Sequence, residues 1–125
     1  MAQITIAQVI AEVDALERND FSTEEKTRWL SRLDGKAFEE VIALREGGPE
    51  SFDGYPADAD PQTPLLIFEP HGEVYTSYLL AQIARHMEEN DLYNERMLTH
   101  QDAWDAWAAS YARSHRQRLG GRIRF

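Results

Sequence analysis

The chain has 125 residues, with 13 basic and 22 acidic side chains, a formal net charge of −9 and no cysteine. This length suits one domain with a single hydrophobic core, and the lack of cysteine excludes disulfide bonds and thiolate metal sites. No apolar run approaches the roughly 18–20 residues of a membrane span, and the N-terminus lacks the basic start of a secretory signal. We therefore expect a soluble, intracellular protein.

Two amphipathic helices are predicted in the first third of the chain. Apolar residues recur at helical spacing from Ile6 to Leu16, and Thr5 can cap a helix of about 13 residues there. Ser22 followed by Glu25 forms the sequence of a capping box, preceded by Phe21 as a hydrophobic staple. The helical phase then continues to Leu44, with Gly47-Gly48 as the stop signal. It runs across Gly35, so we expect one helix with a close contact or slight bend there, the alternative being a two-helix break.

Residues 47–64 are rich in turn-forming glycine and proline and show no periodicity. A loop of this length in a compact domain is usually functional or disordered. We expect it to be fixed at a few points and to dock through three residues: Phe52, Asp53 and Tyr55. Residues 65–68 form a short apolar run that we expect to be extended.

From Pro70 the pattern is helical to about Ser114. We predict two helices, about 71–89 and 91–114, because the most polar stretch lies between them; one bent helix is the alternative. The predicted fold is therefore all-α, a small bundle of three to five helices with a long central Pro/Gly-rich loop. Residues 1–115 form its single domain, and residues 116–125 form a basic C-terminal arm that we expect to be flexible.

Catalytic and metal-binding patterns are missing from the sequence. A di-iron bundle needs Glu-x-x-His pairs, whereas the chain has only the reversed spacing, His86 to Glu89. A calcium loop starting at Asp58 fails because Thr63 stands where glycine is required. No nucleophile motif or phosphate loop occurs. We therefore predict no catalytic residues, metal or cofactor, and we expect the four histidines to be packing or surface groups.

The charge is divided between the two parts of the chain. Residues 1–112 contain 8 basic and 22 acidic residues, a net charge of −14, whereas the last 13 residues contain five arginines and no acid. An acidic body repels nucleic acid, so any DNA contact is expected through the arm only. We favour docking of the arm on an acidic neighbouring protein. The aromatic row near the end of the last helix has two interpretations, as core or as subunit interface, because tryptophan, tyrosine and arginine are enriched in interface hot spots. The candidate interface residues are Trp104, Trp107, Tyr111, Arg113, Arg116, Arg118, Arg122, Arg124 and Phe125.

Three sequence blocks and a Tyr-Asn pair carry a resemblance over most of residues 5–115: FSTEEKTRWLSRLDGKAFEEVI, FDGYPADADPQTPLLIFEPHGEVYTSYLLAQI, Tyr93-Asn94 and AWDAWAASYARSH. They resemble small helical proteins encoded in the structural-gene clusters of tailed phages and bacterial prophages. Such proteins are similar to head–tail connector, or head-completion adaptor, subunits that form a ring under the portal. The resemblance implies a structural role without enzymatic activity.

The implied partners are further copies of the chain in a homo-oligomeric ring, the portal and tail-completion proteins, and the implied location is the virion or the cytoplasm of the bacterial host. An adaptor ring requires head-to-tail contacts between unlike surfaces, which an acidic body and a basic arm provide. The alternative is a nucleic-acid-binding accessory or regulatory module that uses the arm.

Overall fold

The computed structural model describes residues 2–118. Over this range the chain forms four α-helices: α1 (Ile6–Leu16), α2 (Thr23–Glu40), α3 (Glu73–His86) and α4 (Asn90–Ser114). A short 3-10 helix, η1 (Ile42–Leu44), follows α2. The described residues form no β-strand, and a long non-helical stretch lies between residues 45 and 72. The all-α prediction is confirmed.

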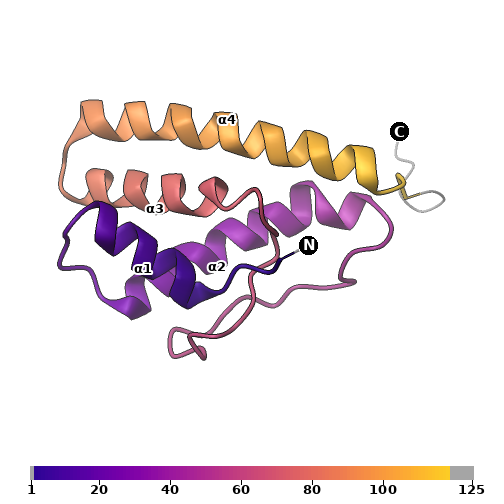
Figure 1. The fold of residues 1–125 in the computed structure, drawn as a ribbon, viewed down its shortest axis with the longest axis horizontal. Coiled ribbons are helices and arrows are strands. Elements are labelled where there is room, and N and C mark those ends of the chain that lie inside the picture. Colours follow the sequence, from indigo (N-terminus) through magenta and orange to yellow (C-terminus); the bar gives the residue numbers. More distant parts are fainter. Residues whose placement is uncertain (1, 119–125) are drawn as a thin grey trace.

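Helix α3 lies at the centre of the bundle. It runs beside α4 along its length, and it also contacts α1 and α2 on its other side (Figure 1). Helix α4 has 25 residues against 14 in α3, so it extends about 16 Å beyond its neighbour at the helical rise of 1.5 Å per residue.

The first two helices begin where the sequence predicts. The Thr5 hydroxyl accepts a hydrogen bond from the backbone N–H of Gln8, and the Gln8 side chain accepts one from the backbone N–H of Thr5. Ser22 and Glu25 form the same reciprocal box at α2. Both boxes satisfy backbone donors that have no partner within the helix. The Phe21 ring then packs against Trp29, with their ring centres 5.4 Å apart.

Helix α2 passes through Gly35 unbroken, as expected, but it ends earlier than the sequence pattern indicates. The backbone leaves helical geometry at Val41, which has φ −128° and ψ −60°. The tighter turn of η1 follows, and it places Ile42 in the core at 1% exposure. The predicted continuation of the helix to the Gly47-Gly48 pair is therefore wrong, because hydrophobic periodicity alone does not separate an α-helix from a 3-10 turn that keeps the same residues buried.

The prediction of two helices after residue 70 is confirmed. Helix α3 ends at His86 and α4 begins at Asn90. Between them Glu88 adopts φ 60°, a left-handed conformation that reverses the chain direction within a short turn.

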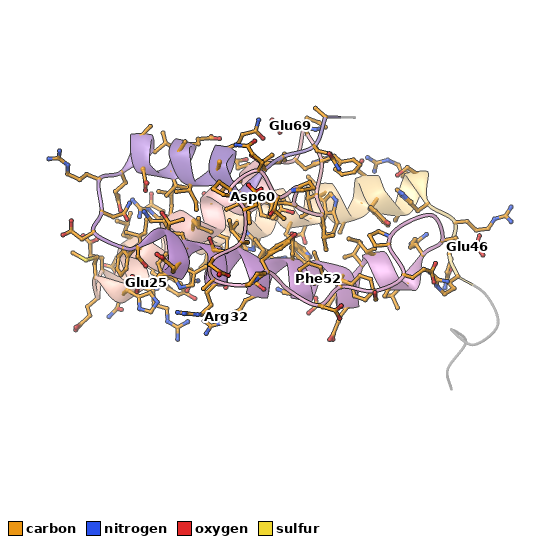
Figure 2. The ribbon with its side chains drawn as sticks, turned by 90° about the horizontal axis from the view of Figure 1, so that it is seen from below. Glu25, Arg32, Glu46, Phe52, Asp60 and Glu69 are labelled. Atoms are coloured by element: carbon orange, nitrogen blue, oxygen red, sulfur yellow. The ribbon has the colours of Figure 1, made fainter. Side chains whose placement is uncertain are left out.

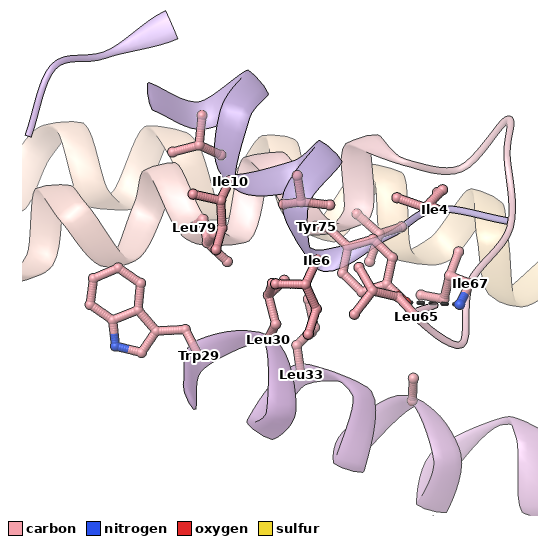
Figure 3. Packing of buried hydrophobic residues seen from close by; sticks show 14 of the residues in the cluster. Ile4, Ile6, Ile10, Trp29, Leu30, Leu33, Leu65, Ile67, Tyr75 and Leu79 are labelled. Carbon is pink, nitrogen blue, oxygen red and sulfur yellow. Dashed lines mark hydrogen bonds between the residues drawn. The ribbon is translucent and has the colours of Figure 1, made fainter. Parts of the chain in front are cut away.

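The core lies where α1, α2 and α3 meet. Figure 3 shows side chains from all three helices converging with Leu65 and Ile67 of the loop. Each fully buried aliphatic or aromatic side chain contributes about 1.5–3 kcal/mol of hydrophobic stabilisation. The helical members drawn and labelled there are Ile6, Ile10, Trp29, Leu30, Leu33, Tyr75 and Leu79.

The long loop crosses the body and then pairs with the N-terminal segment. Figure 2 shows its path from Glu46, past Phe52 over α2, to Asp60 and finally to Glu69. The Ile6 N–H donates to the Thr63 carbonyl at 3.1 Å, and the Leu65 N–H donates to the Ile4 carbonyl at 2.7 Å. The stretch at residues 65–68, which the sequence predicts to be extended, is therefore paired with the N-terminal segment. The sequence contains no second strand-like pattern, and the N-terminal segment takes the place of that missing strand.

Candidate docking surfaces

The central loop is fastened to the body by one buried carboxylate, Asp34 on α2. Asp34 is fully buried, and its Oδ2 accepts hydrogen bonds from the Tyr55 hydroxyl at 2.5 Å and the Leu66 N–H at 3.1 Å. Its Oδ1 accepts one from the Tyr75 hydroxyl at 2.7 Å, and that hydroxyl in turn accepts from the Ile67 N–H at 2.8 Å. A single side chain thus ties two points of the loop and helix α3 to α2.

Burial shifts the pKa values of the three ionisable side chains in this cluster upward. Burial raises the pKa of Asp34, while the hydrogen bonds from its three donors oppose the rise. Burial and the neighbouring Asp34 charge also raise the pKa values of Tyr55 and Tyr75 well above the ordinary tyrosine range. Three donors on two oxygens satisfy an ionised carboxylate, so Asp34 acts as a structural acceptor.

Of the three loop residues predicted to dock, Tyr55 is bonded to α2 of its own chain. Its hydroxyl binds Asp34, and its backbone N–H donates to the Ser31 hydroxyl at 2.9 Å. Phe52 is half-buried and packs edge-on against Tyr55, with ring centres 5.0 Å apart. Asp53 is exposed. The anchor, Asp34, was absent from the sequence-based candidates, although its spacing of four residues from Leu30 puts it on the apolar stripe.

The aromatic row of α4 faces inward. Trp104 is 7% exposed and Trp107 is 4% exposed, and their rings pack edge-to-face with centres 5.2 Å apart. The Lys36 ammonium lies 4.7 Å from the centre of the Trp104 ring. The two tryptophans therefore belong to the hydrophobic core of the chain, in line with the first of their two interpretations, and the outer surface of α4 is formed by other residues.

Tyr111 lies at the edge of this row. Its ring stacks on His115 with ring centres 3.7 Å apart, beside a cavity of about 160 Å³ that Gly48 also lines. Its hydroxyl oxygen is buried and has no hydrogen-bond partner among residues 2–118. A Cβ at position 48 would overlap the Tyr111 hydroxyl oxygen and lie 2.9 Å from Ile42 Cγ2, so a larger residue there forces neighbouring side chains to move.

The first residues of the C-terminal arm are paired with the body. The Glu46 N–H donates to the Arg116 carbonyl at 2.8 Å, and the Arg118 N–H donates to the Leu44 carbonyl at 3.0 Å. The Arg118 guanidinium donates to the carbonyls of Ala43 and Arg45, both at 3.1 Å. The guanidinium of Arg118 is thus bonded within its own chain.

The remaining arm arginines differ in their surroundings. Arg113 and Arg116 have exposed side chains. Arg122, Arg124 and Phe125 lie outside the described residues.

Helix α4 presents an acidic outer face. Leu98, at 70% exposure, lies near the middle of this face. The exposed acidic residues on α4 that flank it at near-helical intervals are Asp91, Glu95, Asp102 and Asp105. Scattered charges of this kind usually keep a surface hydrated, and a single exposed leucine needs no special explanation.

A groove of about 570 Å³ lies between α1, α3 and α4. Aliphatic side chains from three segments line it: Ile4, Val9, Leu16 and Leu80. Three exposed carboxylates also line it, Glu12 from α1, Glu69 from the end of the loop and Glu73 from α3. The groove thus combines apolar surface with negative charge.

Arg96 is the basic residue that lines this groove, and its charge is already paired. Its guanidinium forms a two-pronged ion pair with Glu17 and also donates to the Leu80 carbonyl at 2.7 Å. The hydrogen bond from Arg96 holds the pKa of Glu17 below its usual range. Because Glu17 offsets Arg96, the three carboxylates of the groove leave it with a net negative charge.

Besides His115, which stacks on Tyr111, two further histidines have defined packing roles. His100 is buried, its Nδ1 donates to the Val74 carbonyl at 3.0 Å, and burial lowers its pKa. The His86 ring stacks on Trp29 with ring centres 5.4 Å apart. Within residues 2–118, no three side chains of the types that bind metals lie close enough together to hold an ion.

Comparisons with protein-family models, curated proteins and solved structures find no match for this chain. None of the described helices is long and apolar enough to cross a membrane.

Proposed function

We propose that the protein is a structural subunit of a tailed phage or prophage particle, a head–tail connector or adaptor that assembles with copies of itself under the portal. The observation that carries the proposal is the division of charge, −14 over residues 1–112 against five arginines and no acid in the last 13. A ring is closed by contacts between two unlike surfaces of each subunit, and opposite charges make such surfaces complementary. The sequence blocks that resemble connector proteins support the same assignment.

The arrangement of the body is compatible with this role. The long loop is held by Asp34 and by the N-terminal segment, so the subunit offers a defined surface to a partner. The acidic groove and the acidic face of α4 are both available for a basic segment.

The test is removal of the gene from a phage or inducible prophage that encodes the protein. We expect filled heads and free tails that do not join, and restoration of joined particles when the wild-type chain is supplied from a plasmid. Electron microscopy of the particles should then show the subunit in a ring next to the portal. Normal joined particles in the absence of the gene would refute the proposal.

A second candidate, DNA binding through the arm, is favoured by the arginines alone. It predicts that the logarithm of affinity falls by about 0.9 per logarithm of salt for each phosphate contacted, so five arginines give a slope of at most about −4.5. Titration of labelled duplex DNA at several salt concentrations measures this slope. Absence of binding at low salt removes the candidate.

A further inference from the structure

We propose that the groove between α1, α3 and α4 is the receptor for the C-terminal segment, residues 119–125, of a second copy of the chain. The proposal rests on the function proposed above and names the two surfaces that meet between neighbouring subunits.

The composition of the groove matches the composition of this segment. The groove offers aliphatic surface together with the carboxylates of Glu12, Glu69 and Glu73. The segment LGGRIRF ends in two arginines that alternate with Ile123 and Phe125. Because side chains alternate in an extended chain, such a segment presents its two cations on one side and its two apolar side chains on the other. Cations and apolar side chains can then meet the carboxylates and the aliphatic surface at the same time.

Charge favours this groove as the receptor. Its three carboxylates are exposed, and its Arg96 is neutralised by Glu17, so an incoming arginine meets no free cation on the described residues that line it. The acidic face of α4 is the rival receptor, but Leu98 is the large aliphatic side chain exposed on it. The groove likewise exposes one large aliphatic side chain, Leu16, but it adds part of Leu80 and is concave, with a volume of about 570 Å³, so it can contact Ile123 and Phe125 from more than one side.

The length of the segment favours a second copy over the subunit's own groove. Seven extended residues span at most about 24 Å. The groove is lined on α4 by Arg96 and Thr99, and Thr99 lies about 22 Å along the helix from Ser114. Arg118, where the segment starts, donates to the Leu44 carbonyl, and Gln117 lies beside Ala112 in the last turns of α4. The segment can reach Glu69 of its own groove, which lies with Ser114 and His115 around the cavity beside Tyr111, but it would have to be almost fully stretched to reach Thr99. Filling the whole groove therefore favours the arm of a neighbouring copy.

The decisive measurement uses a fluorescent peptide of residues 117–125 as probe. The receptor is the full-length chain carrying R122E and R124E, so that its own arm does not compete. We expect saturable binding by fluorescence anisotropy, weaker at higher salt because the charges are exposed and screened. Adding Glu12→Lys and Glu73→Lys to the receptor should weaken binding at least tenfold.

The matched control places Glu95→Lys and Asp102→Lys on the outer face of α4 instead, with the same change in charge. We expect binding within twofold of the unmodified receptor. Equal weakening by both pairs would show that binding follows net charge only, and selective weakening by the α4 pair would place the receptor on that face. Either result, or no binding of the peptide, overturns the proposal. Urea unfolding of each receptor shows whether it is folded, and Glu12→Gln with Glu73→Gln replaces the lysine pair if it is not.

Sedimentation velocity of the intact chain tests the second-copy assignment. We expect concentration-dependent association in the wild type, its loss in both R122E/R124E and E12K/E73K, and its recovery when all four substitutions are in one chain. The opposite outcome is a wild type that stays monomeric and does not bind the peptide, together with an R122E/R124E variant that does bind it. That outcome would show that each arm fills the groove of its own chain, and it would overturn the proposal. In that case the proposed function would still stand if phage heads and tails failed to join without the gene for this protein, because the deletion experiment does not depend on where the arm binds.

Discussion

Replacing Asp34 by asparagine tests how strongly the buried carboxylate holds the fold together. The substitution keeps the shape of the side chain but turns one acceptor oxygen into an N–H₂ donor. The least costly orientation places the nitrogen at the Oδ1 position, since Oδ2 serves two donors, Tyr55 and Leu66. The Tyr75 hydroxyl, which already accepts from Ile67, then loses the acceptor for its proton.

The magnitude follows from this one unpaired donor. A buried donor without a partner costs about 1–3 kcal/mol, and removal of a buried charge offsets part of the loss. We expect Asp34→Asn to lower the free energy of unfolding by about 2 kcal/mol, out of the roughly 5–15 kcal/mol typical of a domain. Each kcal/mol corresponds to about 3–6 °C in the melting temperature for a chain of this size.

The assay is urea unfolding followed by circular dichroism, with Tyr75→Phe completing a double-mutant cycle. The two substitutions should couple by about 1 kcal/mol, because Tyr75→Phe removes the hydroxyl that Asp34→Asn leaves unpaired. Hydrogen exchange adds a local readout. The Leu66 N–H should stay protected in Asp34→Asn, and the Ile67 N–H should lose protection in Tyr75→Phe.

The control is Asp102→Asn on the exposed face of α4, which should change stability by less than about 0.5 kcal/mol. Two results would refute the reasoning. One is an Asp34→Asn variant as stable as the wild type, and the other is strict additivity with Tyr75→Phe.

Three further predictions concern other contacts of the fold. Gly48→Ala should destabilise by about 1–3 kcal/mol because its Cβ overlaps the Tyr111 hydroxyl, and Tyr111→Phe in that background should recover part of the loss; thermal melts of the single and double variants decide this. Burial lowers the pKa of His100 in the folded chain. The stability gained from burying neutral His100 is therefore fully present above the pKa of about 6.5 that histidine has in the unfolded chain, and it is lost as pH falls through the lower pKa of the folded chain. His100→Gln should therefore show a flatter stability profile between about pH 7 and 5, and identical profiles would contradict the assignment. Glu17→Gln should lower the free energy of unfolding by about 1 kcal/mol at low salt and by less in about 1 M salt, because the ion pair of Glu17 with Arg96 is partly exposed and therefore screened; urea titration at both salt concentrations measures this. The same ion pair holds the pKa of Glu17 down, so its contribution to stability is lost as pH falls through the glutamate range.

The helices could be predicted from sequence because their signals are local. Thr5 and the Ser22–Glu25 box mark the helix starts with side chains that bond within three residues, and apolar periodicity indicates the buried faces. The early end of α2 could not be predicted, because the turn at Val41 keeps Ile42 on the same buried face as a continued helix would.

The surfaces were less predictable because they depend on contacts distant in sequence. The role of Asp34 requires Tyr55 and Tyr75, which are 21 and 41 residues away. Trp104 shows the same limit: its sequence spacing fits both core and interface, and its burial in the core is seen only in the folded chain. The groove combines α1, α3, α4 and the end of the loop, so no single stretch of sequence indicates it.

The pairing of Arg116 and Arg118 with residues 44–46 has a mechanical consequence. Tension applied to the C-terminus enters the body at Arg118 and crosses to the segment after α2 before it reaches the end of α4. Several backbone and guanidinium bonds then share the load, and the last turn of α4 is shielded from being unwound. The chain can therefore be pulled at its C-terminal end without losing helix α4, which precedes that end.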